Sequence, residues 1–134
     1  MHSIQPTERV SRRLQEAEII WVASVRPNGA PHLSPVWFVW DGGRLFICIS
    51  PASRKARNLA QNPQVAVSLE DGRRVVIVEG IASPATGEER EQVAPLFLRK
   101  YDWDIRADQT YTLLLKITPR KFLTWGDEAQ VQRE

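Results

Sequence analysis

The sequence predicts one mainly β domain with a few short helices, arranged as a small barrel of about six to seven antiparallel strands. Short runs rich in β-branched and aromatic residues recur along the chain, and turn signals separate many of them, at Asn28-Gly29, Asp41-Gly42 and Asp71-Gly72. Few segments have the 3.6-residue period of a helix. The 134 residues also suit a single domain whose core is large enough to need no disulfide.

The first predicted element is a short helix, because Thr7 can act as its N-cap and apolar residues follow at helical spacing. Two more helices are expected. One comprises residues 53–61 and is capped by the Ser53 hydroxyl; the other comprises residues 87–101, and Pro95 should divide it. The predicted strands comprise residues 19–25, 33–40, 44–50, 64–70, 73–83, 111–118 and 121–125.

Turn chemistry and one glycine indicate how the strands pair. Asn-Gly and Asp-Gly tolerate the positive φ angles of tight hairpins, so we expect the first three strands to form an antiparallel meander. Gly80 lies inside the strand 73–83, where it predicts a bulge or a close approach of two backbones.

The strand 33–40 is apolar on both of its faces. Alternation places Trp37 and Val39 on one face and leaves the other face to Val36, Phe38 and Trp40. In a lone small barrel one face of a strand should meet water, so the second face requires a helix or a partner subunit. The sequence therefore favours a homodimer.

Composition and charge exclude several classes of protein. The single cysteine cannot form an internal disulfide, and no Cys/His spacing is typical of a zinc site, so we expect no metal. The net charge of +2 is small for a general polyanion binder, so an anion site would be local. No apolar run approaches the roughly 20 residues of a membrane span. We expect a cytoplasmic domain over residues 1–125, followed by a polar tail over residues 126–134.

The clearest local signal is a run of cations at the start of a predicted helix. Arg54, Lys55 and Arg57 follow the expected cap Ser53, although the positive end of a helix dipole favours anions. Backbone N–H groups at a helix N-terminus together with Arg and Lys side chains can bind a phosphate. A solvated basic face would explain the same residues, and the pattern alone leaves both interpretations open.

Other candidate residues carry weaker signals. His32 could titrate near neutral pH at the rim of a ligand cleft or could be an ordinary surface histidine. Cys48 stands in an apolar strand and is expected in the core. Trp37 and Trp125 could line an aromatic pocket. No hydrolase elbow, Walker loop or dinucleotide fingerprint occurs, so in an enzyme a cofactor would supply the difficult chemistry.

An ordered set of motifs is similar to that of one known family. They are Gly29-Ala30-Pro31-His32-Leu33-Ser34-Pro35-Val36-Trp37-Phe38, Asp41-Gly42-Gly43, Ser53-Arg54-Lys55-Ala56-Arg57-Asn58-Leu59, Asn62-Pro63 and Val78-Glu79-Gly80-Ile81-Ala82. With a final strand ending at Trp125, the set resembles the pyridoxamine 5′-phosphate oxidase-like superfamily over about four-fifths of the chain. The resemblance implies an FMN-binding split barrel.

The resemblance also implies a homodimer with two cofactor sites at the subunit interface. The segment Ser53, Arg54 and Lys55 would hold the cofactor phosphate, in agreement with the run of cations. Arg57 and Asn58 would be further contacts. The residues expected to border the cofactor ring are Ser34, Pro35, Val36, Trp37, Ile49 and Ser50.

The chain lacks the C-terminal tryptophan and arginine segment with which the vitamin-forming oxidases bind pyridoxal, so we do not expect it to be a true pyridoxamine-phosphate oxidase. It looks more like the short, stand-alone branch, whose members use FMN or the deazaflavin F420; the residues favour neither. The expected function is hydride transfer between this cofactor and a small organic acceptor, with His32 or Ser34 as proton donor. The alternatives are a non-catalytic flavin or haem carrier and, well behind, a nucleic-acid-binding barrel. We expect a small-molecule substrate, and neither nucleic acid nor a membrane as partner.

Overall fold

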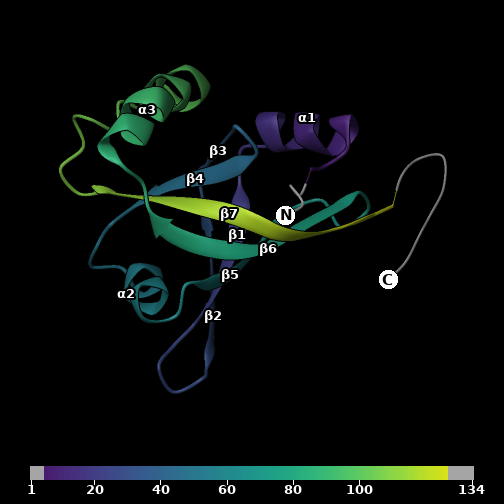
Figure 1. Ribbon diagram of the computed structural model, residues 1–134, viewed down its shortest axis with the longest axis horizontal. Helices are drawn as coiled ribbons and strands as arrows, with labels where there is room; N and C mark the ends of the chain where they lie inside the picture. The colour runs from purple at the N-terminus through teal and green to yellow at the C-terminus, as the bar shows by residue number, and fades with distance from the viewer. Residues whose placement is uncertain (1–4, 127–134) are drawn as a thin grey trace.

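A seven-stranded antiparallel sheet forms the centre of the computed structural model, which describes residues 5–126. The predicted polar tail 126–134 lies outside the described residues apart from Gly126. The helices are α1 (Glu8–Glu16), α2 (Arg54–Gln61) and α3 (Gly87–Tyr101), and the strands are β1 (Ile20–Val25), β2 (Pro31–Val36), β3 (Val39–Asp41), β4 (Arg44–Ile49), β5 (Gln64–Leu69), β6 (Val75–Pro84) and β7 (Leu113–Trp125). Figure 1 shows α1 and α3 on one side of the strands and α2 on the other.

The sheet curls into an open barrel because of one short connection. Its strand order is β2-β1-β5-β6-β7-β4-β3, so β2 and β3 are the two edges. Only Trp37 and Phe38 join them, and two residues allow at most about 11 Å between the flanking Cα atoms. The edges must therefore approach each other without pairing. This arrangement confirms the predicted mainly β split barrel.

The predicted strand 33–40 and the predicted meander are wrong. The run is two strands on opposite edges of the sheet, and β2 pairs with β1 whereas β3 pairs with β4. No glycine or turn residue marks the boundary at Trp37, because the direction of the chain changes there through contacts with distant residues. The boundary at Trp37 also explains why residues 33–40 are apolar on both faces. They do not form one strand with a single buried face, and at the boundary Phe38 is buried in the barrel whereas Trp37 is exposed.

Two further boundaries differ from the prediction. Residues 113–125 form one strand, and its pairing with β6 shifts register where Gly80 meets Pro119. A Cβ on Gly80 would lie 2.4 Å from the Thr118 carbonyl oxygen, which confirms the predicted close approach. Helix α3 continues through Pro95, since buried residues before and after the proline hold both halves against the sheet; an interior proline otherwise costs about 3 kcal/mol.

Two hydrophobic clusters stabilise the fold. The larger lies inside the barrel and includes Leu14 of α1. The smaller packs α3 against β3, β4 and β7 and is centred on Phe97. Within the described residues no helix combines the length and the apolar character needed to cross a membrane.

Glu89 ties the start of α3 to the sheet. It forms a capping box with Thr86, and its Oε2 lies 2.7 Å from Arg44 Nη1 and 2.9 Å from Lys116 Nζ. The Thr86 backbone N–H, followed by Lys116 and Arg44, lowers the pKa of Glu89 to about 2. Because the pKa is depressed in the folded state, Glu89 stabilises the fold above its ordinary pKa of 4.5.

We therefore expect the free energy of unfolding to fall as the pH decreases from 4.5 towards 2. Glu89→Gln should remove part of this dependence, as measured by urea unfolding at several pH values. Glu88→Gln, in the same turn but exposed, is the control and should keep the wild-type dependence. Parallel pH profiles for wild type and Glu89→Gln would contradict the assignment.

Candidate functional site

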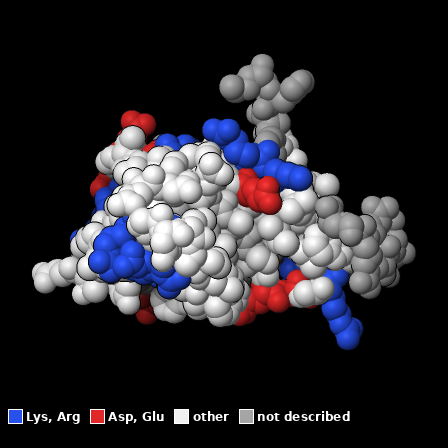
Figure 2. All heavy atoms as spheres, turned by 90° about the horizontal axis from the view of Figure 1, so that it is seen from below, with Lys and Arg blue, Asp and Glu red and all other residues white. Residues whose placement is uncertain are grey.

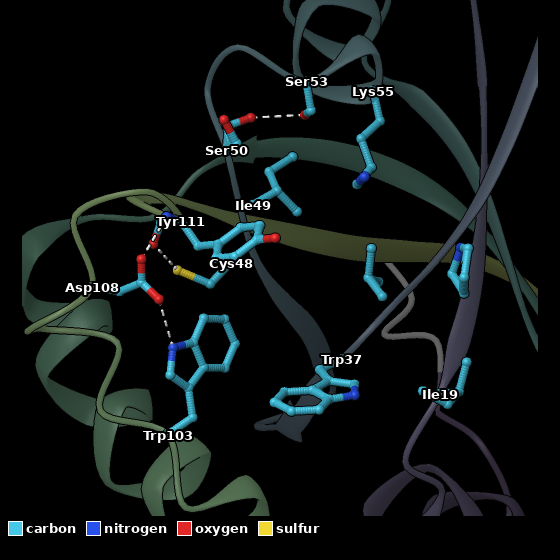
Figure 3. Close-up of a pocket in the computed structure, with 12 residues that line it drawn as sticks. Ile19, Trp37, Cys48, Ile49, Ser50, Ser53, Lys55, Trp103, Asp108 and Tyr111 are labelled. Atoms are coloured by element: carbon cyan, nitrogen blue, oxygen red, sulfur yellow. Dashed lines mark hydrogen bonds between the residues drawn. The ribbon is translucent and has the colours of Figure 1, made fainter.

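A pocket of about 630 Å³ opens beside the junction of β2 and β3. Residues from five parts of the chain meet there: the residue before β1, the end of β2, the end of β4, the start of α2 and the connection between α3 and β7 (Figure 3). The pocket is lined by Ile19, Pro35, Val36, Trp37, Cys48, Ile49, Ser50, Ser53, Lys55, Trp103, Asp108 and Tyr111.

One wall of the pocket is aromatic. Trp103 lies edge-on to Trp37, with ring centroids 5.8 Å apart, and edge-on to Tyr111 at 6.0 Å. Phe97 supports Trp103 from the core at 5.5 Å. Such edge-to-face contacts hold aromatic rings in fixed orientations. The wall thus offers a rigid apolar surface to a flat ligand.

Hydrogen bonds within the protein fix Asp108, the Trp103 indole and the backbone of Tyr111 at this wall. Asp108 accepts from Trp103 Nε1 at 2.9 Å and from the Tyr111 backbone N–H at 2.8 Å. The Tyr111 backbone N–H and then the Trp103 indole lower the pKa of Asp108. The Cys48 thiol donates to the Tyr111 carbonyl oxygen at 3.1 Å, and burial raises its pKa to about 11. A thiol in this state is not a nucleophile at neutral pH.

The opposite side of the pocket carries a positive charge. Lys55 extends from the first turn of α2 into the pocket (Figure 3). Burial lowers its pKa, and no carboxylate within residues 5–126 forms an ion pair with it. Ser53 caps the helix by accepting from the Ala56 N–H at 3.2 Å and donates to the Ser50 carbonyl oxygen at 2.7 Å. The predicted Ser53 cap is confirmed.

His32, on strand β2, lies close to Lys55 and to two further cations, Arg26 and Arg54. Its pKa is lowered by burial and then by the charges of Arg26, Lys55 and Arg54, so the imidazole is neutral at neutral pH. Its Nδ1 atom and the Ser34 Oγ atom are buried and have no hydrogen-bond partner in the described part of the chain. Figure 2 shows Lys and Arg side chains gathered in a compact patch at the end of the molecule where α2 lies. The donor set of this patch suits a phosphate group.

The structure brings together seven of the residues predicted from the sequence. Lining the pocket are Pro35, Val36, Trp37, Ile49, Ser50, Ser53 and Lys55.

The remaining predicted site residues do not line the pocket. His32 and Ser34 lie further along the inner face of β2, and Arg54 lies beside His32. Arg57 is exposed on the far side of α2. Asn58 is fully buried and donates from Nδ2 to Ser24 Oγ at 3.0 Å, so in this structure its role is to attach α2 to β1.

The sequence analysis did not identify much of the aromatic wall, and it wrongly offered Trp125 as a pocket residue. Trp103, Asp108 and Tyr111 follow α3 without a recognisable motif; the density of aromatic residues there was the only signal. Cys48 was expected in the core and is indeed buried, but it also borders the pocket. Trp125 pairs with Val75 at the other end of the sheet and does not line the pocket.

No group of three or more His, Cys, Asp or Glu side chains within residues 5–126 could hold a metal ion. A phosphate-bearing ring compound fits better, because an aromatic wall stands opposite Lys55, which has no ion-pair partner among the described residues. The buried and unpartnered atoms of His32 and Ser34 belong to residues on the same face of β2 as Val36.

Comparisons with known proteins agree with this geometry. The family model described as pyridoxamine 5′-phosphate oxidase matches residues 6–126. The chain is 32% identical over 123 residues to the 5a,11a-dehydrotetracycline/5a,11a-dehydrooxytetracycline reductase of Streptomyces rimosus, covering 82% of this chain and 75% of that protein.

Solved structures share the fold. An F420 reductase aligns with a TM-score of 0.70 at 23% identity, over 90% of this chain and 98% of that one. HutZ, the haem storage protein from Vibrio cholerae, aligns with a TM-score of 0.74 at 24% identity, over 92% and 95% of the two chains. Identities this low show a common fold only.

Proposed function

Because the chain belongs to the pyridoxamine 5′-phosphate oxidase family, we propose that it is an oxidoreductase that transfers a hydride between FMN or F420 and a small organic acceptor. A true pyridoxamine-phosphate oxidase activity is not part of the proposal.

The observation that carries the proposal is that one pocket combines an aromatic wall with a cation that has no ion-pair partner among the described residues. Trp37, Trp103 and Tyr111 can flank a flat ring, and Lys55 lies opposite them. Lys55 is half-buried and has no counter-ion among the described residues, so its ammonium loses part of its hydration without compensation. An anionic ligand group would remove that cost and would add a charge-assisted hydrogen bond.

The inner face of β2 could connect the two ends of such a ligand. Val36 lines the pocket, and Ser34 and His32 follow on the same face of the strand. At about 3.4 Å per residue, Ser34 lies about 7 Å and His32 about 14 Å along the strand from Val36. Ser34 is therefore the better placed proton donor, whereas His32 lies with the cations at the phosphate end.

When bound, FMN or F420 would supply the hydride chemistry. The residues of this chain would orient the ring, exclude water with the aromatic wall and bind the phosphate through Lys55 and Arg54. Arg57 and Asn58 have no direct role in this proposal, given their positions.

We propose further that the active form is a homodimer. Strand β2 is an edge of the sheet, and its outward residues Pro31, Leu33 and Pro35 are exposed. Leu33 is 62% exposed, which is unfavourable for a leucine in an edge strand facing water. A second copy would cover this face.

Relatives support either a reductase or a haem protein. The Streptomyces relative is named a reductase, whereas HutZ is described as a haem storage protein. None of the residues that line the pocket is a histidine, the usual proximal haem ligand. We therefore favour the reductase and retain haem storage as the alternative.

Titration of the purified protein with FMN, F420 and haem, each added separately, tests the proposal. We expect FMN or F420 to bind at micromolar concentration or below, followed by quenching of cofactor fluorescence. The bound cofactor, once reduced without oxygen, should be reoxidised by a quinone added as the acceptor.

Two results would contradict the reductase. Absence of FMN and F420 binding by folded protein would exclude both cofactors, and tight haem binding would then support the alternative. Binding without reoxidation by any acceptor would indicate a carrier protein.

A further inference from the structure

The last residues of α3 hold the junction between β2 and β3. The Phe38 N–H donates to the Tyr101 hydroxyl at 3.0 Å, and the Phe38 carbonyl oxygen lies 2.8 Å from that hydroxyl and 3.1 Å from Lys100 Nζ. Lys100 Nζ also lies 4.1 Å from the centroid of the Phe38 ring. Residues that are remote in the sequence thus satisfy the backbone of Phe38, which lies outside the sheet ladder.

The Tyr101 hydroxyl has one proton to donate and two acceptors in reach. The carbonyl oxygens of Phe38 and Glu18 both lie at 2.8 Å. Burial raises the pKa of Tyr101 to about 12, so the hydroxyl stays protonated in the physiological range. The Tyr101 side chain therefore links α3 to the residues before β1 and to the junction between β2 and β3.

The ring of Tyr101 also fixes the orientation of Trp37. The two rings are stacked, with centroids 4.6 Å apart and planes inclined by 6°. Tyr101 covers one face of the indole and Trp103 touches it edge-on. Trp37 is nevertheless 46% exposed and lines the pocket, so its free face is available to a ligand (Figure 3).

We infer that Tyr101 is a positioning residue that holds the Trp37 indole as a stacking platform for a planar conjugated ring. The inference rests on the proposed function insofar as the ring would belong to the cofactor or to the acceptor. A cofactor ring and an acceptor ring would both present a flat π-system to Trp37. Stacking on such a ring requires no hydrogen bond from the indole. Lys100 assists by holding the Phe38 carbonyl oxygen.

The test measures ring binding with three probes: FMN, riboflavin, which has the same ring without the phosphate, and menadione, a planar quinone. Stacking on an aromatic side chain corresponds to about a 5- to 150-fold effect on affinity. We expect Trp37→Leu and Tyr101→Leu to weaken binding of at least one probe within this range. Tyr101→Phe, which keeps the stacked ring, should restore binding to within about fivefold of wild type.

Trp125→Leu is the matched control, because it makes the same substitution at a tryptophan outside the pocket. Near-ultraviolet circular dichroism provides a readout that needs no ligand. The signal removed by Trp37→Leu should be largely absent in Tyr101→Leu and retained in Tyr101→Phe. Urea unfolding of each variant checks that it is folded during the binding experiments.

The probes distinguish the two sources of the ring. Weaker binding of both FMN and riboflavin would assign the platform to the cofactor ring. Weaker binding of menadione alone, with KM raised and kcat retained in turnover, would assign it to the acceptor.

The inference is overturned if Trp37→Leu or Tyr101→Leu binds all three probes like wild type, or if wild type binds none of them. The proposed function fails separately if riboflavin or menadione binds through Trp37 but neither FMN nor F420 supports hydride transfer.

Discussion

Lys55→Ala should weaken the binding of FMN or F420 by about 10- to 150-fold, the effect of losing a hydrogen bond to a charged group worth about 1.5 to 3 kcal/mol. The ammonium lies in the pocket with no carboxylate partner among the described residues, so a phosphate would be its counter-ion. Isothermal titration at fixed ionic strength measures the change directly.

Two controls separate a phosphate contact from a general loss of positive charge. Arg57→Ala removes an equal charge from the exposed side of the same helix and should leave affinity within about twofold. Riboflavin, which lacks the phosphate, should bind to wild type and Lys55→Ala alike. Equal loss of riboflavin and FMN affinity in Lys55→Ala would show that the substitution disturbs the pocket instead.

Phe97→Ala should lower the free energy of unfolding by about 3 to 5 kcal/mol, because it removes a large side chain from a packed core. Phe97 is fully buried at the centre of the cluster between α3 and the sheet. It also supports Trp103, with ring centroids 5.5 Å apart. Urea unfolding followed by far-ultraviolet circular dichroism measures the loss of stability.

Leu98→Ala is the matched control for this helix. Leu98 is the next residue along α3 and is 44% exposed, so we expect a change within about 0.5 kcal/mol. Similar losses for the two variants would contradict the packing assigned to α3. At urea concentrations where Phe97→Ala remains folded, it should also bind ring compounds more weakly, since the aromatic wall loses its support.

Local chemistry made much of the fold predictable. The hairpins β1–β2, β3–β4 and β5–β6 occur at the predicted Asn-Gly and Asp-Gly turns, because a tight turn depends on a few consecutive residues. The Thr7 and Ser53 caps are confirmed for the same reason. A capping hydroxyl needs only the backbone N–H three residues later.

The errors arose where contacts between distant residues decide the conformation. The boundary at Trp37 and Phe38 has no turn residue, and Tyr101 and Lys100 of α3 satisfy the backbone there. Similarly, Pro95 does not divide α3, because the buried residues around it are packed against the sheet. Local propensity yields to tertiary packing in both places.

The candidate site shows the same division. The sequence by itself determined the hairpins, the helix caps and the cations of α2, since each depends on neighbours along the chain. Only the tertiary structure decided that Trp103, Asp108 and Tyr111 face Lys55 across a pocket and that Tyr101 holds Trp37 there. The physical reason is that such contacts join residues far apart in the chain, and they form only when the sheet curls and brings its two edges together.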